Sequence, residues 1–166
     1  PIASRHERGA VMAADGFSRT SNRQKFGVVA VQSQAGAENA MGGLAQAYAD
    51  AIPILVLPGG LRLSQIGVRP NFSATQNYPN VVKNVQAIYS PDQVGNVMRR
   101  AFHALRNGPG GPVVVEMTSD VCAQEVPKEG RNYHSPKSSC QVPTSGDIKD
   151  AVKALLAAKN PVIYAG

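Results

Sequence analysis

Short apolar runs alternate with amphipathic helical patterns along this chain, and that order constrains its fold more than any other feature. The runs at residues 26–31, 52–60 and 111–117 are typical of buried strands, and residues 84–89 form a shorter candidate. Between them, apolar residues recur at i, i+3, i+4 and i+7, which predicts helices over 37–49 and 94–105. Strands that alternate with helices pair in parallel, so the sequence predicts an α/β domain with a parallel sheet.

A glutamate stands at the start of a further predicted helix, over residues 8–17. The expected core stripe of this helix is Ala10, Ala13, Ala14 and Phe17, and Glu7 projects from the same face one turn earlier. A carboxylate at the mouth of an apolar stripe is costly unless it has partners. From its position alone, Glu7 has two ordinary explanations: the helix dipole favours it in the first turn, or it pairs with Arg5 or Arg8.

Two adjacent glycines interrupt the predicted helix over 37–49. Gly42 and Gly43 each cost on the order of 1 kcal/mol relative to alanine. Small residues let another backbone approach closely, and we expect this surface to pack across a boundary between subunits.

The periodicity disappears after residue 118 and returns near the C-terminal end. Pro127, Pro136 and Pro143 interrupt a polar stretch, which is long for a connection within one domain. We therefore divide the chain into a domain at 1–121, a linker at 122–145 and the start of a second α/β domain at 146–166, with a strand at 161–166. The first residue is Pro1, and we expect the chain to be a piece of a larger multidomain protein, incomplete at its N-terminal end.

Composition and cysteine spacing argue against several functions. The net charge is +6, but the 17 Lys and Arg residues are scattered and no nucleic-acid motif occurs, so we expect no nucleic-acid partner. No apolar run reaches the roughly 18 residues that a membrane span needs, and no export leader is visible. Cys122, Cys140 and three separated histidines lack metal-site spacing. We expect free thiols in a reducing cytoplasm and no metal site in this chain.

Three motifs in register carry a family resemblance. The segments "RHERGAVMAADGFSR", "GLAQAYADAIPILVLPGG" and "MRRAFHALRNGPGGPVVVEMTSDV" resemble the thiamine-diphosphate-dependent enzymes of the acetolactate synthase group. The resemblance covers residues 3–121 in unbroken order. It implies that 1–121 is a pyrimidine-binding domain, which in this family precedes a central α/β domain and a diphosphate-binding domain.

The resemblance gives Glu7 a catalytic and cofactor-binding role. The glutamate of the family's "RHE" motif bonds N1′ of the aminopyrimidine ring, and it favours the tautomer that removes the C2 proton of the thiazolium. Desolvation is expected to hold the pKa of Glu7 near that of the ring nitrogen. His6 has the simpler explanation of shaping the chain at this point.

A loop motif adds Gly36 and Asn39 as cofactor-binding residues. "QSQAGAEN" falls where the family reads Ser-Gly-Pro-Gly-Ala-x-Asn, and Gln34 and Ala35 replace the Gly-Pro pair. Ser73, after Phe72, replaces a glutamine that faces the active site in acetolactate synthases. These departures suggest a relative that acts on a different 2-oxo acid.

The resemblance also implies cofactors and partners. The family binds Mg²⁺ and the cofactor's diphosphate through a Gly-Asp-Gly motif, which does not occur here. We therefore expect thiamine diphosphate and Mg²⁺ to need a domain outside this chain, and the chain alone to be inactive. FAD is compatible with the resemblance, but no residue indicates it. A homodimer or homotetramer is implied, because the family's cofactor lies between subunits.

A second interpretation is a non-catalytic binding or regulatory module that kept the fold. Glu7 argues against it, since a module without chemistry has no need of this carboxylate.

Overall fold

A computed structural model describes residues 1–128, 133–139 and 141–164. Its elements, in chain order, are α1 (Glu7–Thr20), β1 (Gly27–Val31), α2 (Ala35–Ala49), β2 (Ile54–Gly60), η1 (Leu63–Gln65), α3 (Ala74–Asn77), β3 (Asn84–Ile88), η2 (Pro91–Gln93), α4 (Val94–Arg106), β4 (Pro112–Thr118), α5 (Ser119–Cys122) and α7 (Ser145–Ala157). Each of the four strands expected before residue 118 is present within two residues of its predicted bounds.

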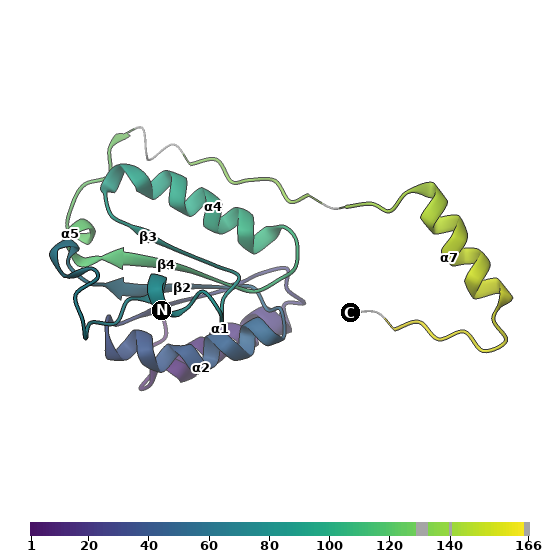
Figure 1. Cartoon of the computed structure of the whole chain (residues 1–166), viewed down its shortest axis with the longest axis horizontal. Coiled ribbons are helices and arrows are strands. Elements are labelled where there is room, and N and C mark those ends of the chain that lie inside the picture. The colour runs from purple at the N-terminus through teal and green to yellow at the C-terminus, as the bar shows by residue number, and fades with distance from the viewer. Residues whose placement is uncertain (129–132, 140, 165–166) are drawn as a thin grey trace.

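The four strands form one parallel sheet in the order β1-β2-β4-β3, which confirms the predicted α/β class. Val29, Val56, Val114 and Val85 form one row across it. Helices α1 and α2 cover the face that carries this row, and α4 covers the opposite face (Figure 1). Since all strands run in one direction, the N-terminal ends of α1 and α2 meet at the carboxyl edge of the sheet.

Helix α1 buries a different face from the one predicted. Its buried residues are Val11, Ala14, Asp15 and Ser18, while Phe17 is 51% exposed. The spacing is again i, i+3, i+4 and i+7, rotated by one residue. Polar side chains occupy the inner face because they have partners there.

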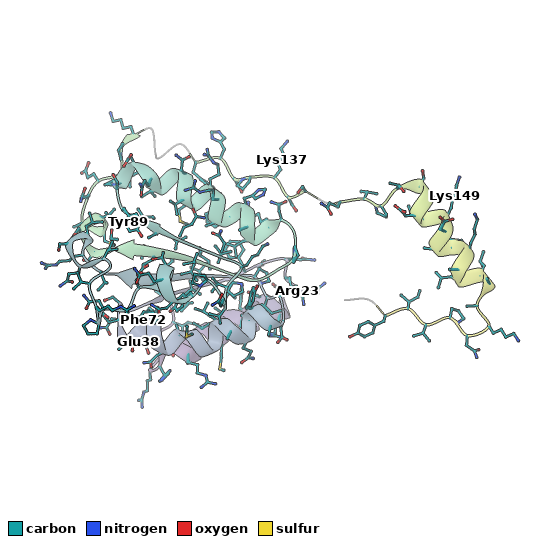
Figure 2. All side chains as sticks on the ribbon, in the orientation of Figure 1. Arg23, Glu38, Phe72, Tyr89, Lys137 and Lys149 are labelled. Carbon is teal, nitrogen blue, oxygen red and sulfur yellow. The ribbon has the colours of Figure 1, made fainter. Side chains whose placement is uncertain are left out.

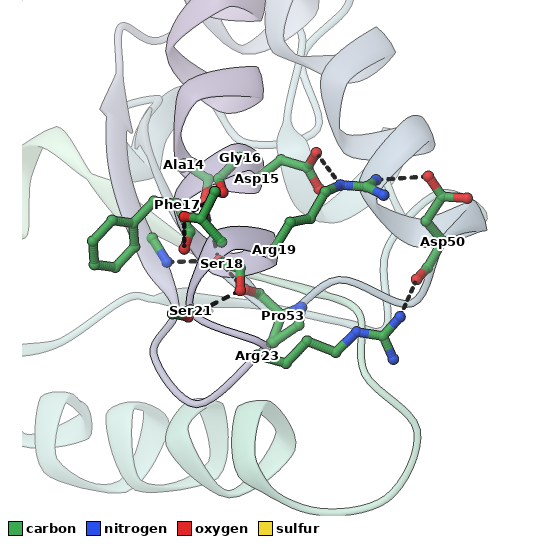
Figure 3. Close-up of polar contacts among 12 residues, drawn as sticks. Ala14, Asp15, Gly16, Phe17, Ser18, Arg19, Ser21, Arg23, Asp50 and Pro53 are labelled. Carbon is green, nitrogen blue, oxygen red and sulfur yellow. Dashed lines mark hydrogen bonds and ion pairs between the residues drawn. The ribbon is translucent and has the colours of Figure 1, made fainter. Parts of the chain in front are cut away.

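Ser18 shows how a polar residue is accommodated in that inner face. Its Oγ lies 2.7 Å from the carbonyl oxygen of Pro53, to which it donates, and accepts a bond from the Gly27 N–H at 2.9 Å (Figure 3). One hydroxyl thus ties α1 to the start of β1 and to the residue before β2. Apolarity alone could not predict this, because an unpaired serine would be disfavoured in the core.

Of the two glycines of α2, Gly43 is buried against α1 within the chain, while Gly42 is exposed. A Cβ on Gly43 would lie 2.8 Å from Cγ1 of Val11 in α1, whereas one on Gly42 would lie 3.4 Å from Nε of the Arg8 side chain. Gly43 therefore allows the close contact of α1 with α2. The expectation that the surface of this helix packs across a boundary between subunits stays a prediction.

Strand β1 is an edge strand, not the fully buried strand that its sequence predicts. Its residues alternate between buried and exposed, and Val28 is 57% exposed. Helix α4 packs over β3 and β4 and leaves this side of β1 uncovered. The apolar sequence of a strand does not show whether a helix covers one face of the sheet at that strand or both.

The start of α4 does not form a capping box, although Ser90 and Gln93 have the sequence spacing for one. Ser90 makes no side-chain bond to the helix backbone, and a 3-10 turn, η2, precedes α4. Gln93 accepts from the Tyr89 N–H at 3.0 Å instead of the Ser90 N–H. The apolar stripe of α4 is as predicted, with Val97, Ala101 and Leu105 buried.

Helix α7, near the C-terminal end, begins with a capping box between Thr144 and Asp147. None of its residues is buried, and its side chains lie away from the sheet (Figures 1 and 2). Residues 161–164 form no strand, because no other strand lies beside them; 165–166 and Cys140 lie outside the described residues. The linker and second-domain assignments remain predictions. No helix among the described residues is long and apolar enough to cross a membrane.

Candidate functional site

The three residues predicted to bind the cofactor lie together at the carboxyl edge of the sheet. Glu7 is the first residue of α1, and its Oε2 accepts a bond of 3.2 Å from Nδ2 of Asn39 in the second turn of α2. Gly36, one turn earlier in α2, lies beside the same carboxylate. The helix N-termini converge because each helix runs antiparallel to the strands, so residues 32 positions apart become neighbours.

Gly36 is placed where a side chain would disturb Glu7. A Cβ there would lie 3.3 Å from Oε1 of Glu7 and 2.8 Å from Cβ of Gln32. The second distance is shorter than real contacts allow, so any larger residue would shift the β1–α2 loop. Glycine at this position thus keeps the space beside the carboxylate open.

The pKa of Glu7 is lowered from its ordinary value of 4.5. Its own backbone N–H contributes most to the lowering, followed by the Asn39 bond, while partial burial opposes both and His6 adds a smaller favourable charge interaction. This direction describes the chain by itself; the expectation that desolvation holds the pKa of Glu7 near that of the ring nitrogen concerns the site with the cofactor bound and stays a prediction. Glu7 is only half-buried, and the bonds to the charged form outweigh the loss of hydration.

His6 acts as the N-cap of α1. Its Nδ1 accepts from the Arg8 N–H at 3.2 Å, and its backbone is extended. This agrees with the simpler explanation given to it, because capping an otherwise unpaired helix N–H is a structural role.

A groove of about 510 Å³ runs along the free edge of β1, with His6 and Glu7 at one end and residues 1–4 as one wall. The remainder of this groove consists of the uncovered sheet edge and carries no other ionisable side chain than those two. The ionisable side chains of this groove therefore lie at the end where Glu7 is.

Strand β4 contains a buried carboxylate that sequence reasoning missed, and it bonds to the segment after β2. Glu116 in β4 is 4% exposed, and its oxygens accept four bonds, from Ser73 Oγ, from the N–H groups of Ala74 and Thr75, and from Thr75 Oγ1. A carboxylate in the otherwise apolar run "PVVVEM" was the signal. It caps the short helix α3 and fixes the segment that carries Phe72.

Ser73 therefore points away from the site. Its Oγ lies 2.9 Å from Oε2 of Glu116 and 2.7 Å from Oγ1 of Thr75, and the residue is buried. The expectation that position 73 is presented to the substrate, as the family's glutamine is, does not hold in this structure. Phe72 is half-buried and packs edge-on against Tyr78, with ring centroids 5.8 Å apart.

No group of three or more His, Cys, Asp or Glu side chains that could hold a metal ion occurs in residues 1–128, 133–139 and 141–164. The glycine-rich stretch at 107–112 joins α4 to β4, and so runs from helix to strand. A phosphate loop of the usual kind runs from strand to helix.

The parallel sheet and the Glu7–Asn39 pair at its carboxyl edge define an α/β domain of the cofactor-binding type. A family model described as "Thiamine pyrophosphate enzyme, N-terminal TPP binding domain" matches residues 1–90. The chain belongs to this family of thiamine-diphosphate enzymes.

Individual relatives agree with this assignment. The chain is 37% identical to the acetolactate synthase isozyme 3 large subunit of Escherichia coli and 33% identical to the probable acetolactate synthase large subunit of Methanocaldococcus jannaschii. Each alignment covers 99% of this chain and 29% of the relative. The crystal structure of benzoylformate decarboxylase from Polynucleobacter necessarius is similar with a TM-score of 0.82 and 26% identity, covering 95% of this chain and 29% of that one. The chain thus spans less than a third of the proteins it matches.

Proposed function

We propose that the protein containing this chain is a thiamine-diphosphate-dependent enzyme that acts on 2-oxo acids by decarboxylation or carboligation, and that Glu7 activates the cofactor. The single observation that carries the proposal is the carboxylate of Glu7, held by Asn39 beside a glycine at the carboxyl edge of the sheet. Family membership and the acetolactate synthase relatives support the reaction class.

The residues present fit the aminopyrimidine end of the cofactor. Gly36 leaves room beside Oε1 of Glu7, and a carboxyl group is the partner that a ring nitrogen needs in order to share a proton. When bound, thiamine diphosphate supplies a thiazolium carbon that becomes a nucleophile on losing its proton. We assign to Glu7 the hydrogen bond with N1′ of the aminopyrimidine ring.

Three residues of this chain have separate roles in this proposal. Glu7 holds the shared proton at a carboxyl oxygen. Asn39 orients the carboxylate by donating to Oε2, and Gly36 keeps the approach to it open. A bound ring would also exclude water from Glu7, so the pKa of the carboxyl would rise from its lowered value towards that of the ring nitrogen.

We further propose that Mg²⁺ and the diphosphate are bound by another part of the protein. The described residues form no group of side chains that could bind a metal ion. We propose the cytoplasm as the compartment of this enzyme. The free thiol of Cys122 agrees with a reducing compartment.

We also propose that the site is shared between two subunits of a homodimer or homotetramer. The uncovered carboxyl edge at Glu7 leaves one side of the site to be supplied by other residues. Mixing a Glu7→Gln protein with one whose diphosphate motif is disabled should restore one working site per mixed dimer. No recovery of activity after subunit exchange would contradict a shared site.

The proposal is tested with Glu7→Gln in the full-length protein. Turnover of a 2-oxo acid should fall by several orders of magnitude, while binding of thiamine diphosphate weakens far less. Glu38→Gln is the matched control, because Glu38 lies exposed in the same turn of α2 as Asn39 and should keep its activity. A loss of less than about tenfold, or about 1.4 kcal/mol of barrier, would remove Glu7 from the mechanism. A wild-type protein without thiamine-dependent turnover would favour the non-catalytic module.

A further inference from the structure

Gln34 has a backbone conformation that is normally reserved for glycine. Its φ of 57° and ψ of −116° lie in the half of conformational space that a Cβ disfavours. The residue stands at the turn between β1 and α2, two positions before Gly36, and its carbonyl accepts the Glu38 N–H at 2.9 Å. A strained residue persists only where its surroundings fix it.

The side chain of Gln34 supplies that fixation. Its Oε1 accepts from the Phe72 N–H at 3.0 Å, and its Nε2 donates to Oδ1 of Asn71 at 3.2 Å. Both ends of the amide are thus bonded to two consecutive residues 37 and 38 positions further along the chain. Glycine, which fits the backbone better, could make neither bond.

A second contact joins the same two segments. The hydroxyl of Tyr78, at the end of α3, donates to the carbonyl oxygen of Ala37 in the first turn of α2. The Phe72 ring packs on Tyr78 between these two ties. Figure 2 shows Phe72 and Glu38, which follows Ala37, at the same end of the sheet. We call residues 71–78, held in this way, the anchored segment.

We propose that Gln34 is a positioning residue for the 2-oxo acid site: it locks the turn before Gly36 to the anchored segment and so holds Gly36 at a fixed distance from the carboxylate of Glu7. This inference rests on the proposed function. The backbone strain of Gln34 offsets the stabilisation from its two side-chain hydrogen bonds. The residue therefore affects the position of the turn more than the free energy of unfolding.

The geometry predicts an effect on substrate binding. Without the tether, the anchored segment keeps the Tyr78 and Glu116 bonds but loses its link at Asn71–Phe72. The turn that carries Gly36 is then free to move relative to Glu7, and a loosely held site binds and discriminates substrates less well. Proton sharing at Glu7 is less affected, since the Asn39 bond comes from the second turn of α2.

The test uses Gln34→Gly in the full-length protein with thiamine diphosphate, Mg²⁺ and the 2-oxo acid that the wild type turns over fastest in a panel that includes pyruvate and benzoylformate. Glycine relieves the strain while it removes the tether, so the fold should survive. Amide exchange in peptides that cover residues 71–76 should become about tenfold faster, because one hydrogen bond is worth about that factor. The KM for this 2-oxo acid should rise about tenfold, which corresponds to about 1.4 kcal/mol, with kcat changed less than about threefold.

Two further variants keep the test decisive. Asn71→Ala removes one of the two tether bonds from the opposite side and should raise the KM in the same direction by a smaller factor. Gln46→Ala, an exposed residue near the end of α2, should change neither exchange nor the KM. If exchange accelerates in Gln34→Gly while the KM stays constant, Gln34 is only structural and the proposal fails. Unchanged exchange shows that no tether exists and overturns it as well. A wild type that turns over none of the 2-oxo acids in the panel would instead refute the proposed function.

Discussion

Asn39 Nδ2 donates to Oε2 of Glu7 at 3.2 Å and so joins the start of α1 to the second turn of α2. The bond stabilises the charged carboxylate and is one of the causes of the lowered pKa of Glu7. The same contact therefore orients the side chain and favours its charged form before any ligand binds.

Asn39→Ala should raise the pKa of Glu7 towards 4.5, because the variant removes one of the bonds that favour the charged form. With a lowered pKa, the folded chain binds fewer protons than the unfolded chain. The bond therefore contributes stability above about pH 4.5 that is lost as the pH falls through the lowered pKa. NMR titration of the Glu7 carboxyl carbon measures the change directly.

The matched control for this titration is Asn96→Ala, in the exposed part of α4. It should leave the Glu7 curve where it is. A Glu7 midpoint that does not rise in Asn39→Ala would show that the bond makes no contribution in solution.

Gly36→Ala should reduce turnover of the full-length enzyme by at least about tenfold, with a loss of cofactor affinity. The added methyl group would lie 2.8 Å from Cβ of Gln32 and 3.3 Å from Oε1 of Glu7, so the carboxylate or the loop must move. Steady-state kinetics and calorimetry with thiamine diphosphate and Mg²⁺ measure both effects. An alanine variant with normal kinetics would show that the space beside Glu7 is not used.

The two glycines of α2 should respond in opposite ways to alanine. Gly43→Ala should destabilise the chain by about 1–3 kcal/mol through overpacking against Val11. Gly42→Ala should be neutral or should stabilise it by up to about 1 kcal/mol, because the flexible Arg8 side chain can move and alanine favours the helix. Urea unfolding of both variants tests the pair, and equal midpoints would contradict the packing described for α1 and α2.

The sequence predicted the fold class well because the signal is repeated in every element. Each apolar run and each helical stripe predicts its own burial, and the apolar residues of 37–49, 94–105 and 111–117 are buried largely as the pattern predicts. The pattern failed for α1, where Asp15 and Ser18 have polar partners in the interior. It also failed for β1, since an edge strand and a central strand have the same apolar composition.

The candidate site was predictable only in part. Glu7, Gly36 and Asn39 were identified through a resemblance, and the structure brings them together. The contacts of Gln34 with Asn71 and Phe72 join segments that are 37 and 38 residues apart. No local pattern encodes such a contact, because it depends on how β1, β2 and the connection after β2 are arranged in space.

Glu116 gives the last prediction. Its carboxylate accepts from two backbone N–H groups, with Ala74 on Oε1 and Thr75 on Oε2. A glutamine has one carbonyl oxygen and one NH₂ group, so Glu116→Gln must place a donor against one of these N–H groups whichever way the amide is turned. One buried backbone donor then loses its partner, which costs about 1–3 kcal/mol. The hydroxyls of Ser73 and Thr75 can rotate, but a backbone N–H cannot.

Urea unfolding of Glu116→Gln should therefore show a loss of about 2–3 kcal/mol. Ser73→Ala is the graded control: it removes one donor, leaves the carboxylate with three bonds, and should cost about 1 kcal/mol. Because Ser73 faces Glu116 and not Glu7, this variant should also leave substrate selectivity in the full-length enzyme unchanged. A Glu116→Gln chain as stable as the wild type would contradict the bonding described for α3, and a change of selectivity in Ser73→Ala would return position 73 to the substrate site.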